Sequence, residues 1–338
     1  MDKKVNLKSL SNDLNISVGT ISRVLNGKAK EYRISEKTIK IVTEYAEKMG
    51  YQPNRVAQSL RVSKTFTVGL LVPDIANPFF STMAKFIEKQ ASALDYSILL
   101  MDSDEDFEKE KKAIDQLKSR NVDGIILCPT SEDISYYEKV VDKSCPIVFI
   151  DRYLNTSKIP FITSDNYGGT FIATQYLINK GHRNITLLQG KQSEPIKMRV
   201  RGFLDALKKN KLSEAQENIT GHSFDIEEAS KTFIDLWERN PTFTAVIALS
   251  NTIGLGVLKA AKSLQLDIPG DISLIVFDEH EYSDFINPAL TTVKQDKESM
   301  GKSAFEMLYK LIQEEDQPNN DFIMTTLVER KSVKKLFI

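Results

Sequence analysis

Three short amphipathic helices are predicted at the start of the chain, because its apolar residues recur there every three or four positions. These residues are Leu7, Leu10 and Leu14, then Ile21, Val24 and Leu25, and finally Ile39, Val42, Ala46 and Met49. Each helix is preceded by a residue that can accept hydrogen bonds from its first backbone N–H groups, namely Asn6, Ser17 and Ser35. Asn15 suits a left-handed turn after the first helix, and Gly27 ends the second. The pattern predicts a helix-turn-helix, whose second helix would enter the major groove of DNA.

From Thr65 onward, short apolar runs alternate with segments long enough for crossover helices. The runs have the length of strands buried on both faces: Val68–Val72, Ser97–Met101, Gly124–Cys128, Ile147–Ile150, Ile185–Leu188, Ala245–Leu249 and Ile272–Phe277. This alternation predicts an α/β body with doubly wound parallel sheets. A body of this length exceeds one comfortable core, so we expect two lobes.

A short segment between these two parts, Tyr51–Arg61, admits two interpretations. Pro53 interrupts the preceding helix, and Asn54 can cap a new one that reaches about Leu60. Such a helix is too short to be stable alone in water and needs a partner helix, DNA or both. Leu60 is an apolar side chain in a basic, polar segment, as a minor-groove wedge requires. A plain interdomain linker with one buried leucine explains the segment equally well.

The charge distribution favours DNA binding by the first part over an ordinary helical bundle. Residues 1–64 contain 13 Lys and Arg against 6 Asp and Glu, whereas the whole chain has 45 against 46. The first part therefore carries a net charge of +7 and the rest −8, which sum to the formal −1 of the chain. A basic end on an acidic body is expected if only that end meets phosphates.

Motifs of catalysis or metal binding are absent from the sequence. It has no Walker or GxGxxG loop, no nucleophile elbow, and only three scattered histidines. The two cysteines, Cys128 and Cys145, lack metal or redox spacing, so we expect reduced packing residues. No enzymatic activity, metal or cofactor is therefore expected. The absence of an apolar leader or a membrane-spanning run predicts a cytoplasmic, nucleoid-associated protein without a membrane partner.

Eight segments in order resemble the lactose/galactose-repressor (LacI/GalR) family of transcriptional regulators. They are Ile16–Asn26, Gly50–Asn54, Val68–Phe80, Asp165–Gly169, Gly181–Ile185, Arg199–Phe203, Val276–Asp278 and Pro288–Thr292. The resemblance spans nearly the whole chain. Any one segment is weak evidence, but the ordered set is highly specific.

The resemblance implies a helix-turn-helix head, a hinge, and a body like a periplasmic sugar-binding protein. The head would span residues 1–50, the hinge helix and linker 51–64, and the effector-binding and dimerisation domain 65–338. Its N-lobe would contain residues 65–163 and 292–322, and its C-lobe 164–291 and 323–338. The three crossovers between the lobes would lie near Thr163–Asp165, Leu290–Val293 and Phe322–Thr325.

The effector is expected between the lobes, and the family's pocket positions fall on particular residues of this chain. They are Phe79, Phe80, Ser193, Arg199, Phe224, Asn251 and Asp278, with Lys197 as a further possible contact. Asn251 replaces the aspartate of many members and removes a charge. For the two N-lobe phenylalanines, packing in the core is the alternative. Arg152 either touches the ligand or only braces a lobe, and the sequence favours neither.

DNA contacts are expected from the second helix, the loop after it and the hinge. The predicted residues are Asn6, Ser17, Val18, Gly19, Thr20, Ser22, Arg23, Asn26, Lys28, Arg33, Asn54, Arg55, Ala57 and Leu60. Val18 and Gly19 occupy the positions that vary most with operator sequence, and glycine has no side chain to read a base. The head is therefore expected to depend strongly on Arg23, Thr20 and the hinge. The loop Lys28–Ile34 is slightly long for the family.

Together these features predict a ligand-responsive transcriptional regulator, expected to be a repressor. A homodimer would bind a pseudo-palindromic double-stranded DNA operator, and a small molecule between the lobes would control the affinity. The resemblance implies a sugar or sugar phosphate as this molecule, with purines as the alternative within the family. A solute-binding or sensor protein without a regulatory role is the alternative, since it would share the body. An α/β enzyme would need a catalytic constellation that the sequence does not display.

Overall fold

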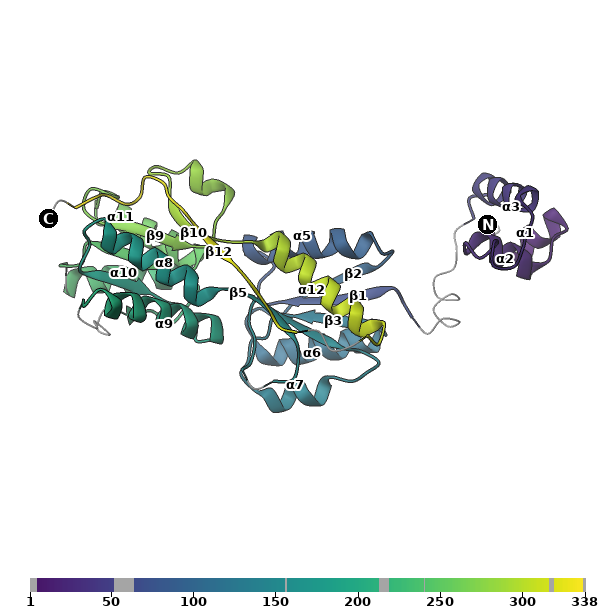
Figure 1. Ribbon diagram of the computed structural model, residues 1–338, viewed down its shortest axis with the longest axis horizontal. Helices are drawn as coiled ribbons and strands as arrows, with labels where there is room; N and C mark the ends of the chain where they lie inside the picture. The colour runs from purple at the N-terminus through teal and green to yellow at the C-terminus, as the bar shows by residue number, and fades with distance from the viewer. Residues whose placement is uncertain are drawn as a thin grey trace. The chain divides into compact units, whose positions relative to one another are not determined.

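The computed structural model describes residues 5–51, 64–155, 157–212, 219–239, 241–315 and 319–336. The chain forms two compact units, a head that ends at Thr65 and a body that begins at Phe66 (Figure 1). Each unit has its own hydrophobic core and is described by itself. Within the described residues, no helix combines the length and apolar character needed to cross a lipid bilayer.

The head contains three helices, α1 (Leu7–Leu14), α2 (Val18–Leu25) and α3 (Glu36–Lys48). As predicted, side chains of Asn6, Ser17 and Ser35 accept hydrogen bonds from the first turn of each helix. Asn15 is left-handed, with φ of +52°. The core of the head consists of Leu10, Ile21, Val24, Ala29, Val42 and Ala46. Met49, which the periodicity placed on the inner face of α3, is instead exposed beyond the end of that helix.

In the described part of the body, the strands form two six-stranded sheets whose strand orders correspond. The N-lobe sheet comprises β1 (Thr67–Val72), β2 (Ser97–Asp102), β3 (Gly124–Leu127), β4 (Ile147–Ile150), β5 (Phe161–Ser164) and β11 (Asp321–Ile323), in the order β11-β5-β4-β3-β1-β2. The C-lobe sheet comprises β6 (Ile185–Leu188), β7 (Ile219–Thr220), β8 (Ala245–Ala248), β9 (Ser273–Phe277), β10 (Thr291–Gln295) and β12 (Thr325–Val328), in the order β12-β10-β9-β8-β6-β7. The strand pairs are parallel except that β12 runs antiparallel to β10.

Helices cover both faces of each sheet, as a doubly wound fold requires (Figure 1). In the N-lobe, α5 (Pro78–Ser92) and α12 (Lys297–Ile312) pack on one face, and α6 (Phe107–Ser119) and α7 (Ile134–Val140) on the other. In the C-lobe, α8 (Asn166–Asn179) and α9 (Glu194–Lys209) cover one face, and α10 (Ile226–Arg239) and α11 (Asn251–Ser263) the other. A short 3₁₀ helix, η2 (Glu281–Asp284), follows β9. Cys128 and Cys145 are buried and unpaired, as expected.

The chain passes between the lobes at three points. It leaves β5 for α8 after Ser164, leaves β10 for α12 after Gln295, and leaves β11 for β12 at Met324. The second crossover differs from the expectation of Leu290–Val293. Strand β10 belongs to the C-lobe sheet because it pairs with β9, so the lobe boundary expected at residue 292 lies after residue 295 instead.

The strand prediction was wrong about the surroundings of β2 and missed several strands. Strand β2 was expected to be buried on both faces, but it forms an edge of the N-lobe sheet, and Leu100 is exposed. Sheet order is a tertiary property that the apolar run Ser97–Met101 does not encode. The missed strands β5, β7, β10, β11 and β12 are short, and β10 begins with two buried threonines, so none gives a strong apolar signal.

The carboxyl ends of the strands of both lobes meet the space between the lobes. Because the two sheets share one strand order, β4 and β9 occupy equivalent places. Each is followed by an aspartate with left-handed backbone, Asp151 with φ of +64° and Asp278 with φ of +87°. Such conformations are costly for residues other than glycine and tend to occur at functional sites. The fold thus brings two buried aspartates to the same cleft from opposite sides.

Candidate functional site

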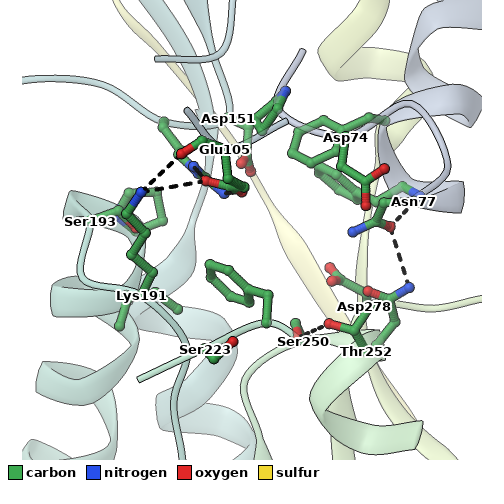
Figure 2. A pocket seen from close by; sticks show the side chains of 18 of the residues that line it. Asp74, Asn77, Glu105, Asp151, Lys191, Ser193, Ser223, Ser250, Thr252 and Asp278 are labelled. Atoms are coloured by element: carbon green, nitrogen blue, oxygen red, sulfur yellow. Dashed lines mark hydrogen bonds and ion pairs between the residues drawn. The ribbon is translucent and has the colours of Figure 1, made fainter. Parts of the chain in front are cut away.

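A cavity of about 490 Å³ lies between the lobes at these strand ends (Figure 2). The carboxylates of Asp74, Glu105 and Asp151 reach it from the N-lobe, and Asp278 from the C-lobe. All seven residues that the sequence assigned to effector binding line this cavity: Phe79, Phe80, Ser193, Arg199, Phe224, Asn251 and Asp278. They come from five separate segments of the chain, so the fold alone brings them together.

Aromatic rings form apolar walls of the cavity. At the start of α5, the rings of Phe79 and Phe80 meet edge to face, with centroids 5.1 Å apart. Both rings are also buried in the N-lobe core, which confirms the packing alternative drawn from the sequence, while their contact with an effector stays a prediction. Phe224 contributes a ring from the C-lobe, and Gly190 makes room for it because a Cβ there would collide with the ring.

Arg199 is fixed inside the C-lobe by two hydrogen bonds and one aromatic ring. From α9, its Nε donates to Asn166 Oδ1 at 2.7 Å, and its Nη1 donates to the Leu249 carbonyl at 2.6 Å. The guanidinium lies 3.6 Å from the centroid of the Phe277 ring. Burial lowers the pKa of Arg199, while the charges of Asp278 and Asp151 oppose this effect. The side chain is thus held rigidly before any ligand arrives.

Buried amides beside Asp278 leave acceptor oxygens unused. Gln295 Nε2 donates to Asp278 Oδ1, and Asn251 Nδ2 donates to Asn77 Oδ1 across the cleft at 3.4 Å. Within the described residues, neither Gln295 Oε1 nor Asn251 Oδ1 has a hydrogen-bond partner, although both are buried. A buried acceptor without a partner is costly, so these oxygens suit a bound molecule that donates hydrogen bonds.

Asp151 is the most perturbed acid of the cavity. Its side chain is buried beside Cys128, whose Sγ lies 3.9 Å from Oδ2. Burial raises the pKa of Asp151 to about 6, against the opposing charges of Arg199 and Arg152. The charge of Asp278 across the cleft raises it further. A carboxyl in this state can exchange its proton near neutral pH as its surroundings change.

Arg152 is occupied by a carboxylate of its own lobe. Its Nη1 and Nη2 donate to Glu105 Oε2 and Oε1 at 2.8 and 2.5 Å, in a bidentate pair. Burial raises the pKa of Glu105, but Arg152 and Lys191 outweigh this effect and lower it. The guanidinium also lies 5.6 Å from the centroid of the Phe224 ring. Of the two roles left open by the sequence, the geometry therefore supports bracing, although Arg152 also lines the cavity.

Lys197 does not line the cavity, contrary to the expectation that it contacts the ligand. Its ammonium instead donates to Glu132 of the N-lobe at 2.8 Å and to Glu194 of its own helix at 2.9 Å. Nearby, Lys191 donates to the Glu105 carbonyl at 3.3 Å (Figure 2). These two lysines tie the lobes together on one side of the cleft.

Sequence reasoning missed much of the polar lining of this site, including Asn77, Glu105, Asp151 and Gln295. Asp151 directly follows the predicted strand Ile147–Ile150, so its place at a strand end was a usable signal. Gln295 and Glu105 gave no such signal, because β10 was missed and Glu105 lies three residues beyond β2.

The polar face of α2 in the head is largely engaged in local hydrogen bonds. The Thr20 and Ser17 hydroxyls lie 2.8 Å apart, and Asn26 Nδ2 donates to the Ser22 carbonyl at 2.6 Å. Val18 is exposed at the start of the helix. A Cβ at Gly19 would meet only the Ser17 hydroxyl, at 3.9 Å, so the surface there is open.

Other predicted DNA contacts lie in the flanks of α2. Lys28 and Arg33 are exposed in the loop that follows it, and Asn6 caps α1. The predicted hinge contacts Asn54, Arg55, Ala57 and Leu60 lie outside the described residues.

Asp151→Asn is expected to change how stability depends on pH. The folded pKa of Asp151, about 6, exceeds that of an unfolded aspartate, about 4, so the folded state binds the proton more tightly. Its contribution to stability is therefore fully present below about pH 4 and is lost as the pH rises through 6. The two pH units correspond to roughly 3 kcal/mol.

Urea unfolding of the body between pH 4 and pH 7.5 tests this prediction. The free energy of unfolding of Asp151→Asn, relative to the wild type, should rise between about pH 4 and 6 and then level off. Asparagine is well suited to the left-handed backbone at this position, so the substitution adds no strain. A difference that stays constant across this range would show that Asp151 ionises normally.

Two family models match the chain. Residues 12–54 match "Bacterial regulatory proteins, lacI family", and residues 65–331 match "Periplasmic binding proteins and sugar binding domain of LacI family". The ribose operon repressor of Halalkalibacterium halodurans is 32% identical, over 97% of this chain and 97% of that protein.

Solved structures resemble both parts of the chain. The lac repressor dimer bound to operator and the anti-inducer ONPF has a TM-score of 0.86 at 25% identity, covering 98% of this chain and 100% of that one. A LacI family regulator from Enterococcus faecium with bound ribose has a TM-score of 0.72 at 25% identity, covering 80% and 100%.

Proposed function

Because the chain belongs to the LacI family of bacterial transcriptional regulators, we propose that it is a repressor controlled by an unphosphorylated pentose, with D-ribose as the first candidate. Its head binds an operator as part of a homodimer, and the pentose occupies the cavity between the lobes. The match of residues 12–54 to the lacI family of bacterial regulatory proteins argues against a solute-binding protein without a regulatory role. The H. halodurans relative and the E. faecium structure, which are named for ribose, support the choice of sugar.

The observation that carries this proposal is the set of fixed polar groups in a small cavity. Ligand sites are usually lined by apolar side chains, with a few polar groups that orient the ligand. Here the phenylalanine rings supply apolar walls, and carboxylates, guanidinium groups and amides supply the polar groups. A molecule that carries a hydroxyl on nearly every carbon can donate to Asp151, Asp278 and the unused oxygens of Asn251 and Gln295, and accept from Arg199. A cavity of about 490 Å³ suits a monosaccharide, at the lower end of the roughly 300–1,000 Å³ usual for small ligands.

The charge of the cavity argues against a phosphate. Six carboxylates line it, from Asp74, Asp104, Glu105, Asp151, Asp225 and Asp278. They face three permanent cations, Arg152, Lys191 and Arg199, two of which already interact with Glu105. A phosphate dianion would find few cations that are not already paired, and the remaining carboxylates would repel it. The choice left open by the sequence between a sugar and a sugar phosphate therefore narrows to the neutral sugar.

Isothermal titration of the full chain with D-ribose and D-ribose 5-phosphate tests the proposal. We expect D-ribose to bind with a dissociation constant in the micromolar range and the phosphate to bind at least about 100-fold more weakly, which corresponds to roughly 2.7 kcal/mol. Hypoxanthine and cellobiose serve as ligands of other chemistry. Tighter binding of the phosphate, or of either of these molecules, than of D-ribose would contradict the assignment.

A further inference from the structure

Tyr32 and Arg23 form a stacked pair on the surface of the head. Arg23 lies in the last turn of α2, and its guanidinium carbon is 4.0 Å from the centroid of the Tyr32 ring. Tyr32 is 47% exposed and is not part of the core of the head. A guanidinium over an aromatic face is attracted by the ring and restricted in the conformations it can adopt.

The loop after α2 is built so that it presents this ring. Within it, the Tyr32 backbone N–H donates to the Lys28 carbonyl at 3.3 Å, which closes one helical turn. Arg33 ends the turn with φ of +51°, and Ile34 N–H donates back to the Ala29 carbonyl at 2.9 Å. Ala29 is buried in the head core and anchors the turn. The extra length that the sequence shows in Lys28–Ile34 therefore forms an ordered turn that carries Tyr32.

Stacking leaves the donors of Arg23 available. In the described part of the head, the five N–H groups of its guanidinium make no hydrogen bond or ion pair. By contrast, Thr20 and Ser22 on the same helix already make local hydrogen bonds. A planar guanidinium with free edges can make paired hydrogen bonds with a guanine or a phosphate. Because Gly19 provides no side chain, Arg23 carries a larger share of the recognition.

We propose that Tyr32 is a positioning residue for operator recognition, which holds the Arg23 guanidinium by its face and leaves its edge to the DNA. The proposal rests on the DNA-binding role of the head. An arginine already ordered before binding loses less conformational freedom when it meets DNA than an unstacked one. Tyr32 thus improves discrimination between sequences without itself having to contact a base.

Substitutions at Tyr32 test this role on a DNA duplex that the wild-type protein selects from a random-sequence library. Fluorescence anisotropy gives the affinity of the full chain for the selected duplex and for a scrambled duplex of equal length. Since each of two heads loses a stacking interaction, we expect Tyr32→Ala to bind the selected duplex roughly 5- to 30-fold more weakly and the scrambled duplex almost unchanged. Tyr32→Phe, which keeps the ring, should bind the selected duplex within about 3-fold of the wild type.

A double-mutant cycle and a matched charge variant complete the test. With Arg23→Ala already present, Tyr32→Ala should cause no additional loss, because the interaction it removes is gone. Lys30→Ala, in the same turn, should weaken binding to the selected and the scrambled duplex by the same factor, as loss of a phosphate contact does. Unchanged binding by Tyr32→Ala, with binding lost by Arg23→Ala, would overturn the positioning role and leave DNA recognition by α2 intact. Equal losses in Tyr32→Ala and Tyr32→Phe would assign the effect to the hydroxyl and overturn the stacking.

Discussion

Arg199→Met is expected to weaken D-ribose binding at least about 100-fold, since a hydrogen bond from a charged donor contributes roughly 1.5–3 kcal/mol and a guanidinium can offer two to the ligand. Methionine keeps most of the apolar volume of the side chain but supplies no donor. The loss of the bonds to Asn166 and Leu249, and of the positive charge beside Asp278 and Asp151, destabilises the body. Urea unfolding of the variant therefore verifies that it is folded at the titration temperature before its ligand affinity is compared with that of the wild type.

Arg201→Met provides a matched control for this prediction. Arg201 lies two residues further along α9, is exposed, and has its Nε 3.7 Å from Asp205 on the surface. We expect the Arg201→Met variant to bind D-ribose with wild-type affinity, because an exposed ion pair of this kind contributes little to the stability of the body. Isothermal titration of both variants with D-ribose measures the two affinities. If Arg199→Met still bound D-ribose with wild-type affinity, the ligand would not lie against α9.

Arg23→Ala is expected to reduce affinity for the selected duplex at least about 30-fold. A bidentate contact to a base contributes roughly 1–3 kcal/mol, and a dimer loses two of them. Binding of the body to D-ribose should not change, since the head has its own core. Anisotropy measured at several salt concentrations distinguishes loss of a base contact from loss of a phosphate contact. Each lost phosphate contact reduces the slope of the logarithm of the affinity against the logarithm of the salt concentration by about one unit.

Lys40→Ala removes one positive charge from the head at a different place. Lys40 lies on α3, is exposed and is 3.8 Å from Glu44. Its loss should change binding to selected and scrambled duplexes by the same small factor. If Arg23→Ala reduced the affinity for the selected duplex no more than Lys40→Ala does, α2 would not read the operator.

The sequence predicted most reliably those features that depend on local periodicity and on ordered motifs. The three helices of the head begin at the predicted caps Asn6, Ser17 and Ser35 because capping needs only residues a few positions apart. The seven cavity residues were identified by a resemblance that covers nearly the whole chain. Periodicity alone assigns no side chain to a cleft to which five separate segments contribute these residues.

Features that depend on contacts between distant segments were not predictable. Lys197 sits beside Arg199 in sequence, yet it faces Glu132 of the other lobe, and only the packing of the lobes determines this pairing. Likewise, the exposure of β2 depends on its place at the sheet edge, and the bidentate pair of Arg152 with Glu105 joins residues 47 positions apart. The stack of Tyr32 on Arg23 was not predictable, because it depends on the conformation of the loop Lys28–Ile34. The sequence showed only that this loop is unusually long.

If a sugar in the body controls DNA binding by the head, D-ribose must change the affinity of the full chain for its operator. Anisotropy titrations of the selected duplex with the full chain are run with and without saturating D-ribose. We predict that the dissociation constant for DNA changes about 5- to 150-fold and that DNA changes the affinity for D-ribose by the same factor, since coupling between two sites is reciprocal. Arg199→Met should show no change at the same sugar concentration. Equal DNA affinity in both titrations, with D-ribose demonstrably bound, would show that the sugar does not control DNA binding.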